Sequence, residues 1–197
     1  MFNLTLLDHL RLTFGHVVYS HKVHTEQATR LARLTHYLRT ALLALMLSTL
    51  GLAVMANFGW ERVAMPAVAV LAGLSLGLFV YWTTSGTEGL SQAHRVCSVK
   101  LWVIRERYRA LLADLADNRL TPEAARDERD ALMRELHAIY DDAPLTDAST
   151  YQTARQSLSA AGAAALSDEE IDQFLPEPLR KTVVPVTPNP GTVGRAG

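Results

Sequence analysis

Two long stretches without a charged residue constrain the fold of this chain more than any other feature of its sequence. The first covers residues 40–60 and the second residues 63–87, and only Glu61 and Arg62 separate them. About 20 consecutive apolar residues are enough for an α-helix to cross the hydrocarbon core of a bilayer. The sequence therefore predicts transmembrane helices at 40–60 and 63–87 that form a two-transmembrane helical hairpin. A hairpin buried inside a soluble bundle is the alternative.

The residues that flank these stretches favour the membrane. Tyr37, Trp60, Tyr81 and Trp82 lie near the ends of the two stretches, where amphipathic rings prefer the membrane–water interface. Pro66 lies near the expected start of the second helix, where its missing N–H costs least. We therefore expect a multi-pass membrane protein with the bilayer as its first partner.

Basic residues lie on both sides of the hairpin, whereas its connecting turn contains only Arg62. Loops rich in Lys and Arg stay in the cytoplasm, so we expect both termini to be cytoplasmic. The flanking basic residues include Lys22, Arg30, Arg33 and Arg39 before the hairpin and Arg95, Lys100, Arg105 and Arg107 after it.

Apolar residues recur with a 3,4 spacing outside the hairpin, which is typical of a coiled-coil seam. The seam before the hairpin comprises Leu7, Leu10, Phe14, Val17, Ala28, Leu31, Leu38 and Leu42, and the same spacing includes His21, His24 and Thr35. The seam after it comprises Leu90, His94, Cys97, Leu101, Ile104, Tyr108, Leu111 and Leu115. We expect long helices that extend the hairpin into a cytoplasmic helical bundle, with the seams packed within one chain and between subunits. Gly15 is expected to break or bend the first helix, and the second seam to continue the second membrane helix.

The remaining elements follow from helix start and stop signals. Asn118-Arg119 is a break, and Thr121-Pro122-Glu123 combines an N-cap, a proline at the first helical position and an acid near the positive end of the helix dipole. That helix is expected to end near residues 141–142, another to begin at 146–149, and a short one to open at Ser167 with capping-box spacing and to end before Pro176. The predicted all-α membrane protein is thus divided into 1–39 (cytoplasmic helical segment), 40–60, 63–87, 88–180 (cytoplasmic helical region) and 181–197 (disordered tail).

Four local sequences, in this order and spacing, resemble the SLATT domain family: YSHKVHTEQA before the hairpin, LWVIRERYRALLADL after it, RDALMRELHAIYDDAPLTDASTYQTARQSL and SDEEIDQFLPEPLR. The resemblance covers residues 12–180. Members are two-transmembrane proteins found alongside nucleotide second-messenger synthetases and nucleotide-sensing domains in bacterial conflict systems. The resemblance implies an effector of the bacterial inner membrane that oligomerises and permeabilises or depolarises it in an antiphage, abortive-infection response. Because the chain has no separate sensing domain, sensing would come from a partner sensor or synthetase, a ligand site in the cytoplasmic helices, or a change in oligomeric state.

The two spans contain few residues that could line a pore. Ala69, Gly73 and Gly77 recur every four residues, a small-residue face on which helices approach closely, either within the hairpin or between subunits. The polar candidates are Ser48, Thr49, Asn57 and Ser75, with Thr83 and Thr84 near the end of the second span. Since no ionisable residue lies at mid-membrane depth, an ion-coupled transporter is disfavoured, while a hydrophobic constriction that opens by wetting is allowed. A non-conducting anchor or scaffold that recruits a partner is the alternative function.

The histidines before the hairpin raise the question of a chemical site. His21 and His24 share a helix face beside Lys22, as an interface, a pH-sensing pair or two ligands of an incomplete metal site would. We favour an interface tuned by protonation. No nucleotide-binding, hydrolase or metalloprotease motif occurs in the sequence, so neither an enzyme nor a cofactor is expected. The net charge of −1 gives no reason to expect a nucleic-acid partner.

Overall fold

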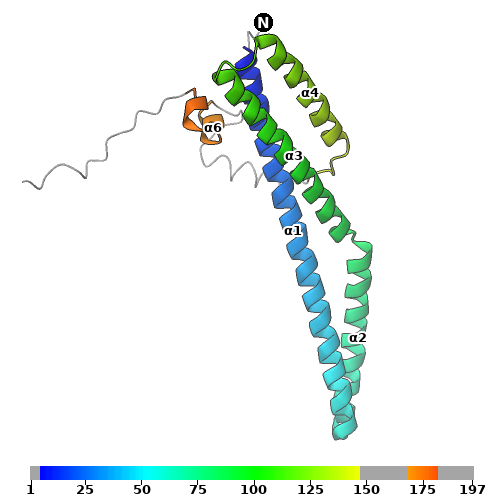
Figure 1. Ribbon diagram of the computed structural model, residues 1–197. Coiled ribbons are helices and arrows are strands. Elements are labelled where there is room, and N and C mark those ends of the chain that lie inside the picture. Colours follow the sequence, from blue (N-terminus) through cyan, green and yellow to red (C-terminus); the bar gives the residue numbers. More distant parts are fainter. Residues whose placement is uncertain (1–4, 147–167, 182–197) are drawn as a thin grey trace, which may run out of the picture.

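Figure 1 shows the computed structural model of the chain, which describes residues 5–146 and 168–181. Every regular element in these two ranges is a helix. The elements are α1 (Leu6–Met55), η1 (Ala56–Trp60), α2 (Glu61–Thr84), α3 (Thr87–Ala116), α4 (Pro122–Asp141), α6 (Asp168–Gln173) and η2 (Glu177–Leu179). The helix expected to begin at 146–149, and all of the expected disordered tail except Lys181, lie outside the described residues.

Helix α1 is unbroken over 50 residues and is therefore about 75 Å long, at about 1.5 Å per residue. It begins with a capping box, in which the side chain of Thr5 accepts a hydrogen bond from the N–H of Asp8 and the carboxylate of Asp8 accepts one in return. The expected break or bend at Gly15 is wrong. Gly15 is buried inside the helix, and the packing of Phe14 and Val18 around it offsets the roughly 1 kcal/mol that glycine costs in a helix.

The chain reverses direction within the first uncharged stretch and not at its charged end. Helix α1 ends at Met55, and two residues of η1 have non-helical backbone angles: Phe58 with φ −103° and Gly59 with φ +92°. Glycine has no Cβ and adopts positive φ without steric cost. Glu61 and Arg62, the pair expected to separate the two helices, instead form the first turn of α2.

Helix α2 returns alongside the C-terminal half of α1, and α3 then continues along the N-terminal half (Figure 1). Pro66 lies inside α2 and not at its start, so the carbonyl of Arg62 lacks its usual helical donor. The second seam does not continue α2, because α2 ends at Thr84 and Gly86 takes a left-handed conformation (φ +62°) before α3 begins. A joint at Ser85-Gly86 therefore separates two helices that were expected to be one.

A single hydrophobic core joins α1, α3, α4 and α6 at the end of the molecule away from the hairpin turn (Figure 1). Helix α4 starts as expected, with Thr121 accepting a hydrogen bond from the N–H of Ala124 and Pro122 at the first helical position. It also ends as expected, at Asp141. The core comprises Leu10, Phe14, Val17, Val18, Cys97, Leu101, Ile104, Tyr108, Leu111, Leu112, Ala125, Leu132, Leu136, Ile171 and Leu175.

A buried ion pair holds α6 and η2 against the N-terminal end of α1. The side chain of Arg11 is only 2% exposed, and its guanidinium donates to the carboxylate of Asp172 on α6 and to the carbonyl of Leu179 on η2. The N–H of Lys181 donates to both carboxylate oxygens of the same Asp172, at 3.1 Å each. Lys181, expected to be the first residue of a disordered tail, is thus part of this contact.

We predict that Arg11→Met releases α6, because it leaves the Asp172 carboxylate buried without its cation. Breaking one side of a buried pair costs about 3–5 kcal/mol. The matched control is Lys181→Met, which removes only the partly exposed pairs of Lys181 with Asp8 and Asp168, worth about 0–1 kcal/mol. The measurement is the unfolding free energy in detergent together with the rate of tryptic cleavage after Arg180. Equal effects of the two variants would contradict the prediction.

Candidate functional site

The helices α1 and α3 meet through a polar layer in the middle of their interface. The Nδ1 atoms of His24 on α1 and His94 on α3 are 2.9 Å apart, and the ring centroids are 5.1 Å apart. Both rings are buried. Because two nitrogens at this distance share one hydrogen, one ring donates and the other accepts.

The surroundings of His94 decide which ring donates. Its Nε2 is buried without a hydrogen-bond partner among the described residues. A bare acceptor is tolerated in that position more easily than an unpaired N–H donor. His94 therefore carries its hydrogen on Nδ1 and donates it to Nδ1 of His24. A proton on Nδ1 of His24 would place two N–H groups face to face, so the contact requires this nitrogen to be unprotonated.

The three residues predicted as one interface or pH-sensing group have separate roles. His21 Nδ1 lies 3.0 Å from the carbonyl oxygen of Ser98 on α3 and 3.1 Å from the hydroxyl oxygen of the same residue. Lys22 forms a partly exposed ion pair with Glu26 on the same helix, at 2.7 Å. Each of the two histidines thus contacts α3 separately at the interface between α1 and α3.

We predict that His24 makes stability depend on pH. Burial, followed by the charge of His94, lowers the pKa of His24 from 6.5 to about 4, and burial also lowers the pKa of His94. Between pH 6.5 and about pH 4, His24 binds a proton in the unfolded chain but not in the folded chain. The free energy of unfolding is therefore highest above about pH 7 and falls as the pH decreases. For His24 alone, the loss is about 2 kcal/mol between pH 7.5 and pH 5.

The measurement is the unfolding free energy of the wild type and of His24→Gln across this pH range. The variant is expected to show a flatter profile. His137→Gln, on the exposed surface of α4, is the matched control and should leave the profile unchanged. An identical slope for wild type and His24→Gln would contradict the assignment.

The second seam supplies the buried face of α3. Its four candidate residues, Leu101, Ile104, Tyr108 and Leu111, are all buried in the core. Both seams start later than expected, because Leu7 (43% exposed) and Leu90 (41% exposed) lie outside the core. Near Leu90, Thr87 and Ser91 are the residues of α3 that contact α1, so Leu90 lies beside the interface.

We predict that Tyr108→Phe leaves stability unchanged or raises it slightly. The hydroxyl of Tyr108 is buried without a hydrogen-bond partner among the described residues, and burial raises the pKa of Tyr108 to about 12. Removing an unpaired polar atom removes its desolvation cost of about 1–3 kcal/mol. Leu101→Ala, at a neighbouring fully buried site, is the contrast and should cost about 2–5 kcal/mol. A loss above 1 kcal/mol for Tyr108→Phe, measured by thermal unfolding, would show that the hydroxyl has a partner.

The hairpin is apolar and exposed. By length and composition, the described chain contains one helical stretch able to cross a membrane, Leu6–Ala116, which includes α1, η1, α2 and α3. Only 11% of its most apolar 18-residue window is buried. The core helix of a soluble protein would be mostly buried, so the described residues do not supply the soluble bundle that was the alternative environment for this hairpin.

The predicted small-residue face of α2 points away from α1. Ser75 and Ala64 are buried towards α1, whereas a Cβ added at Gly73 or Gly77 would meet nothing within 4 Å. Gly73 precedes Ser75 by two residues, about 200° around the helix. Ala69 is exposed on the same face as the glycines.

The predicted pore-lining polar residues use their own hydrogens within their own helices. Thr49 donates to the carbonyl of Leu45, Asn57 to that of Ala53 and Ser75 to that of Leu71. Ser48 is exposed on α1. In a single hairpin, Thr49 and Ser75 line one hollow between α1 and α2 whose other lining residues are apolar.

Charged and aromatic residues mark the level where the hairpin meets the rest of the molecule. The guanidinium of Arg39 donates to both carboxylate oxygens of Glu88, at 3.0 and 2.8 Å. The same guanidinium lies 5.2 Å from the centre of a ring of Trp82. Next to this ion pair, Thr35 on α1 and Thr87 on α3 are buried with their hydroxyls 3.3 Å apart. These contacts fix the register of α1 and α3 at the base of the hairpin.

No group of three or more His, Cys, Asp or Glu side chains able to hold a metal ion occurs among the described residues. Cys97 is buried in the core, and burial raises the pKa of its thiol, so the thiol is kept protonated.

An all-helical chain with an exposed apolar hairpin and long polar extensions is the architecture of a membrane-associated helical protein. The family model described as "SMODS and SLOG-associating 2TM effector domain family 4" matches residues 6–170. The chain belongs to this family of two-transmembrane effector domains, as the resemblance of its local sequences indicated. No curated protein and no solved structure shows a significant match to the chain.

Two contacts were not predicted from the sequence. His94 was placed on the second seam but not paired with His24, because spacing within one helix does not give the alignment of two helices. Arg11 and Asp172 were not singled out. The one available signal for Arg11 was a charged residue next to seam positions Leu10 and Phe14, and nothing local links it to a carboxylate 161 residues away.

Proposed function

We propose that the chain is an effector that spans the bacterial inner membrane twice, oligomerises, and permeabilises or depolarises that membrane in a conflict response against phage. The observation that carries the proposal is the exposed apolar hairpin in a chain of this effector family. Helix α2, with 24 residues, is about 36 Å long and exceeds the roughly 30 Å of a bilayer's hydrocarbon core.

The charges around the hairpin support an orientation with both termini in the cytoplasm. The polar parts of α1 and α3 carry Arg33, Arg39 and Arg95, whereas near the chain reversal the only basic residue is Arg62, beside Glu61 in the first turn of α2. Positive residues favour the cytoplasmic side. The core of α1, α3, α4 and α6 is then the cytoplasmic part, where a partner that makes or senses a nucleotide second messenger would bind.

The small-residue face of α2 supports assembly through the membrane. Glycine and alanine let helix backbones approach closely, and van der Waals contact between helices drives association where no hydrophobic effect operates. Because Gly73 and Gly77 have open space beside them, this face is free to receive a second copy. An assembly of several hairpins would surround a path lined mostly by apolar side chains, which conducts only when it becomes wetted. The proposal includes no catalytic step.

A non-conducting membrane scaffold is the second candidate function. It is favoured by the internal use of the hydroxyl and amide hydrogens of Thr49, Asn57 and Ser75, since a water-filled pore would gain from free donors. In this alternative the cytoplasmic helices recruit the partner and the hairpin only anchors it.

The decisive experiment measures leakage directly. The full chain is reconstituted in liposomes that contain a self-quenching dye, and the same chain is overexpressed in cells that report membrane potential. We predict leakage and depolarisation by the wild type, and at least a tenfold reduction by Gly73→Leu with Gly77→Leu, because bulk on this face separates the helices. The matched control is Leu74→Phe, which adds volume at an exposed position of α2 off this face.

Each outcome assigns one function. Tight liposomes and an intact potential with membrane-inserted wild type would exclude permeabilisation and leave the scaffold. Leakage that survives the double leucine variant would retain permeabilisation and exclude this face as the contact between copies.

A further inference from the structure

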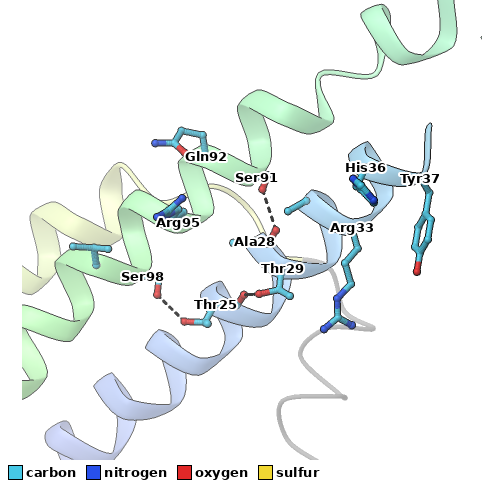
Figure 2. A pocket seen from close by; sticks show the side chains of 12 residues that line it. Thr25, Ala28, Thr29, Arg33, His36, Tyr37, Ser91, Gln92, Arg95 and Ser98 are labelled. Carbon is cyan, nitrogen blue, oxygen red and sulfur yellow. Dashed lines mark hydrogen bonds between the residues drawn. The ribbon is translucent and has the colours of Figure 1, made fainter. Parts of the chain in front are cut away.

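Two hollows between α1 and α3 join into one groove that reaches the base of the hairpin. The first hollow, farther from the hairpin turn, has a volume of about 660 Å³ and is shown in Figure 2. The second hollow, nearer the hairpin turn, has a volume of about 540 Å³ and ends at Arg39 and Glu88. They share the lining residues Ala32, His36, Ser91 and Gln92. The groove is therefore continuous from the polar half of the molecule to the level where the uncharged stretch begins.

Small side chains create this groove. The hydroxyl of Ser91 on α3 donates to the carbonyl of Ala28 on α1 at 3.0 Å, which ties the two helices together along its floor (Figure 2). Ala28, Ala32 and Ser91 fill little of the space between longer neighbours on either side. The hollow follows from the same residues that allow the close approach of the helices.

The charge of the groove is positive and uncompensated. Arg33 and Arg95 line the first hollow, which has no acidic residue in its lining. Neither arginine forms an ion pair with a carboxylate among the described residues, in contrast to Arg39, which is paired with Glu88. Guanidinium groups donate in a fork that matches phosphate oxygens. A phosphate group is thus a ligand that the guanidinium of either arginine is suited to bind.

Few other polar side chains in the groove have hydrogens free to bind a phosphate. Thr25 and Thr29 donate their hydroxyl hydrogens to carbonyls of their own helix, at 2.8 and 2.9 Å. Gln92 and His36 remain as further N–H donors in the lining. The first hollow thus offers donors around its rim and no acid in its lining, and Glu88, the acid of the second hollow, is paired with Arg39.

A third hollow, on the hairpin, decides between a soluble and a membrane-bound phosphate compound. It has a volume of about 540 Å³ and is lined by apolar residues of α1 and α2 that include Met46, Leu50 and Phe79. Met46 follows Ala28, and Leu50 follows Ala32, by five full turns of 3.6 residues, so both hollows lie on one side of the unbroken α1. From His36 to Met46 the rise is about 15 Å, and one leaflet of hydrocarbon is also about 15 Å thick.

We propose that an anionic phospholipid of the inner leaflet binds along this side of α1. Its phosphate is held by Arg33 and Arg95, and its acyl chain lies over the apolar hollow at Met46. This inference rests on the proposed insertion of the hairpin in the membrane, and it adds a specific lipid site to it. The shared chemistry is a phosphate ester, and a soluble phosphate compound without acyl chains is the competing source.

The experiment is native mass spectrometry of the full chain released from neutral detergent and titrated with short-chain phosphatidylglycerol. Arg33→Gln with Arg95→Gln is expected to weaken binding at least tenfold, because each charge-assisted contact is worth a factor of about ten or more. The matched control removes the same charge from residues outside the groove lining, with Arg119→Gln and Arg134→Gln, and should change binding less than twofold. Arg33→Lys with Arg95→Lys keeps the charge and should retain most of the binding, which separates charge loss from misfolding.

Other outcomes overturn the site. Equal losses for the test and control pairs would reduce the effect to general surface charge. Displacement of the lipid by an equal concentration of glycerol 3-phosphate would assign the groove to a soluble phosphate compound. Resistance to carbonate extraction and dye leakage are measured with the same variants. Wild-type lipid binding by Arg33→Gln with Arg95→Gln, with extraction resistance and leakage unchanged, would refute the lipid site alone and leave the proposed function intact.

Discussion

The unbroken backbone ladder of α1 is the constraint on which the rest of the structure depends. Within a membrane, each N–H and C=O must be paired inside the protein, and a continuous helix satisfies this along its whole length. Because α1 has no break between Thr5 and Met55, it passes from polar to apolar surroundings without exposing a backbone group. Helices α2 and α3 are both placed against this single support (Figure 1).

The side chains along α1 change in kind as the helix approaches the hairpin. Far from it, Leu10, Phe14 and Val17 contribute to a hydrophobic core. Farther along, His24 and Thr35 form buried polar contacts with α3. Apolar packing supplies free energy without direction, whereas hydrogen bonds require one alignment. The polar contacts therefore set the register of α1 and α3, and the core supplies the stability that keeps them together.

The sequence predicted the elements well where the signal was local. The uncharged stretches predicted the apolar helices, the 4,3 spacing predicted the buried face of α3 from His94 to Leu111, and Thr121-Pro122 predicted the start of α4. It failed where competing local costs or long-range contacts decide. Gly59 reverses the chain although the charged pair Glu61-Arg62 marks a more obvious turn.

The candidate sites show the same division. Spacing placed His24 on a helix interface, but its partner His94 depends on how two helices 70 residues apart in sequence align. The position of Gly73 and Gly77 away from α1 depends on the rotation of α2 about its own axis, and a repeat of small residues cannot give that rotation. The groove with Arg33 and Arg95 arises only after α1 and α3 are side by side.

The joint at Ser85-Gly86 makes the two helices of the hairpin differ in how they connect to the rest of the molecule. On one side, α1 is a stiff rod, so a turn or shift imposed at Arg11 reaches Met55 with little loss. On the other side, the left-handed residue Gly86 interrupts the helical backbone between α2 and α3. A rotation of the polar part of α1 would thus continue along one helix into the apolar hairpin, whereas α2 meets α3 at the interrupted backbone of Ser85-Gly86.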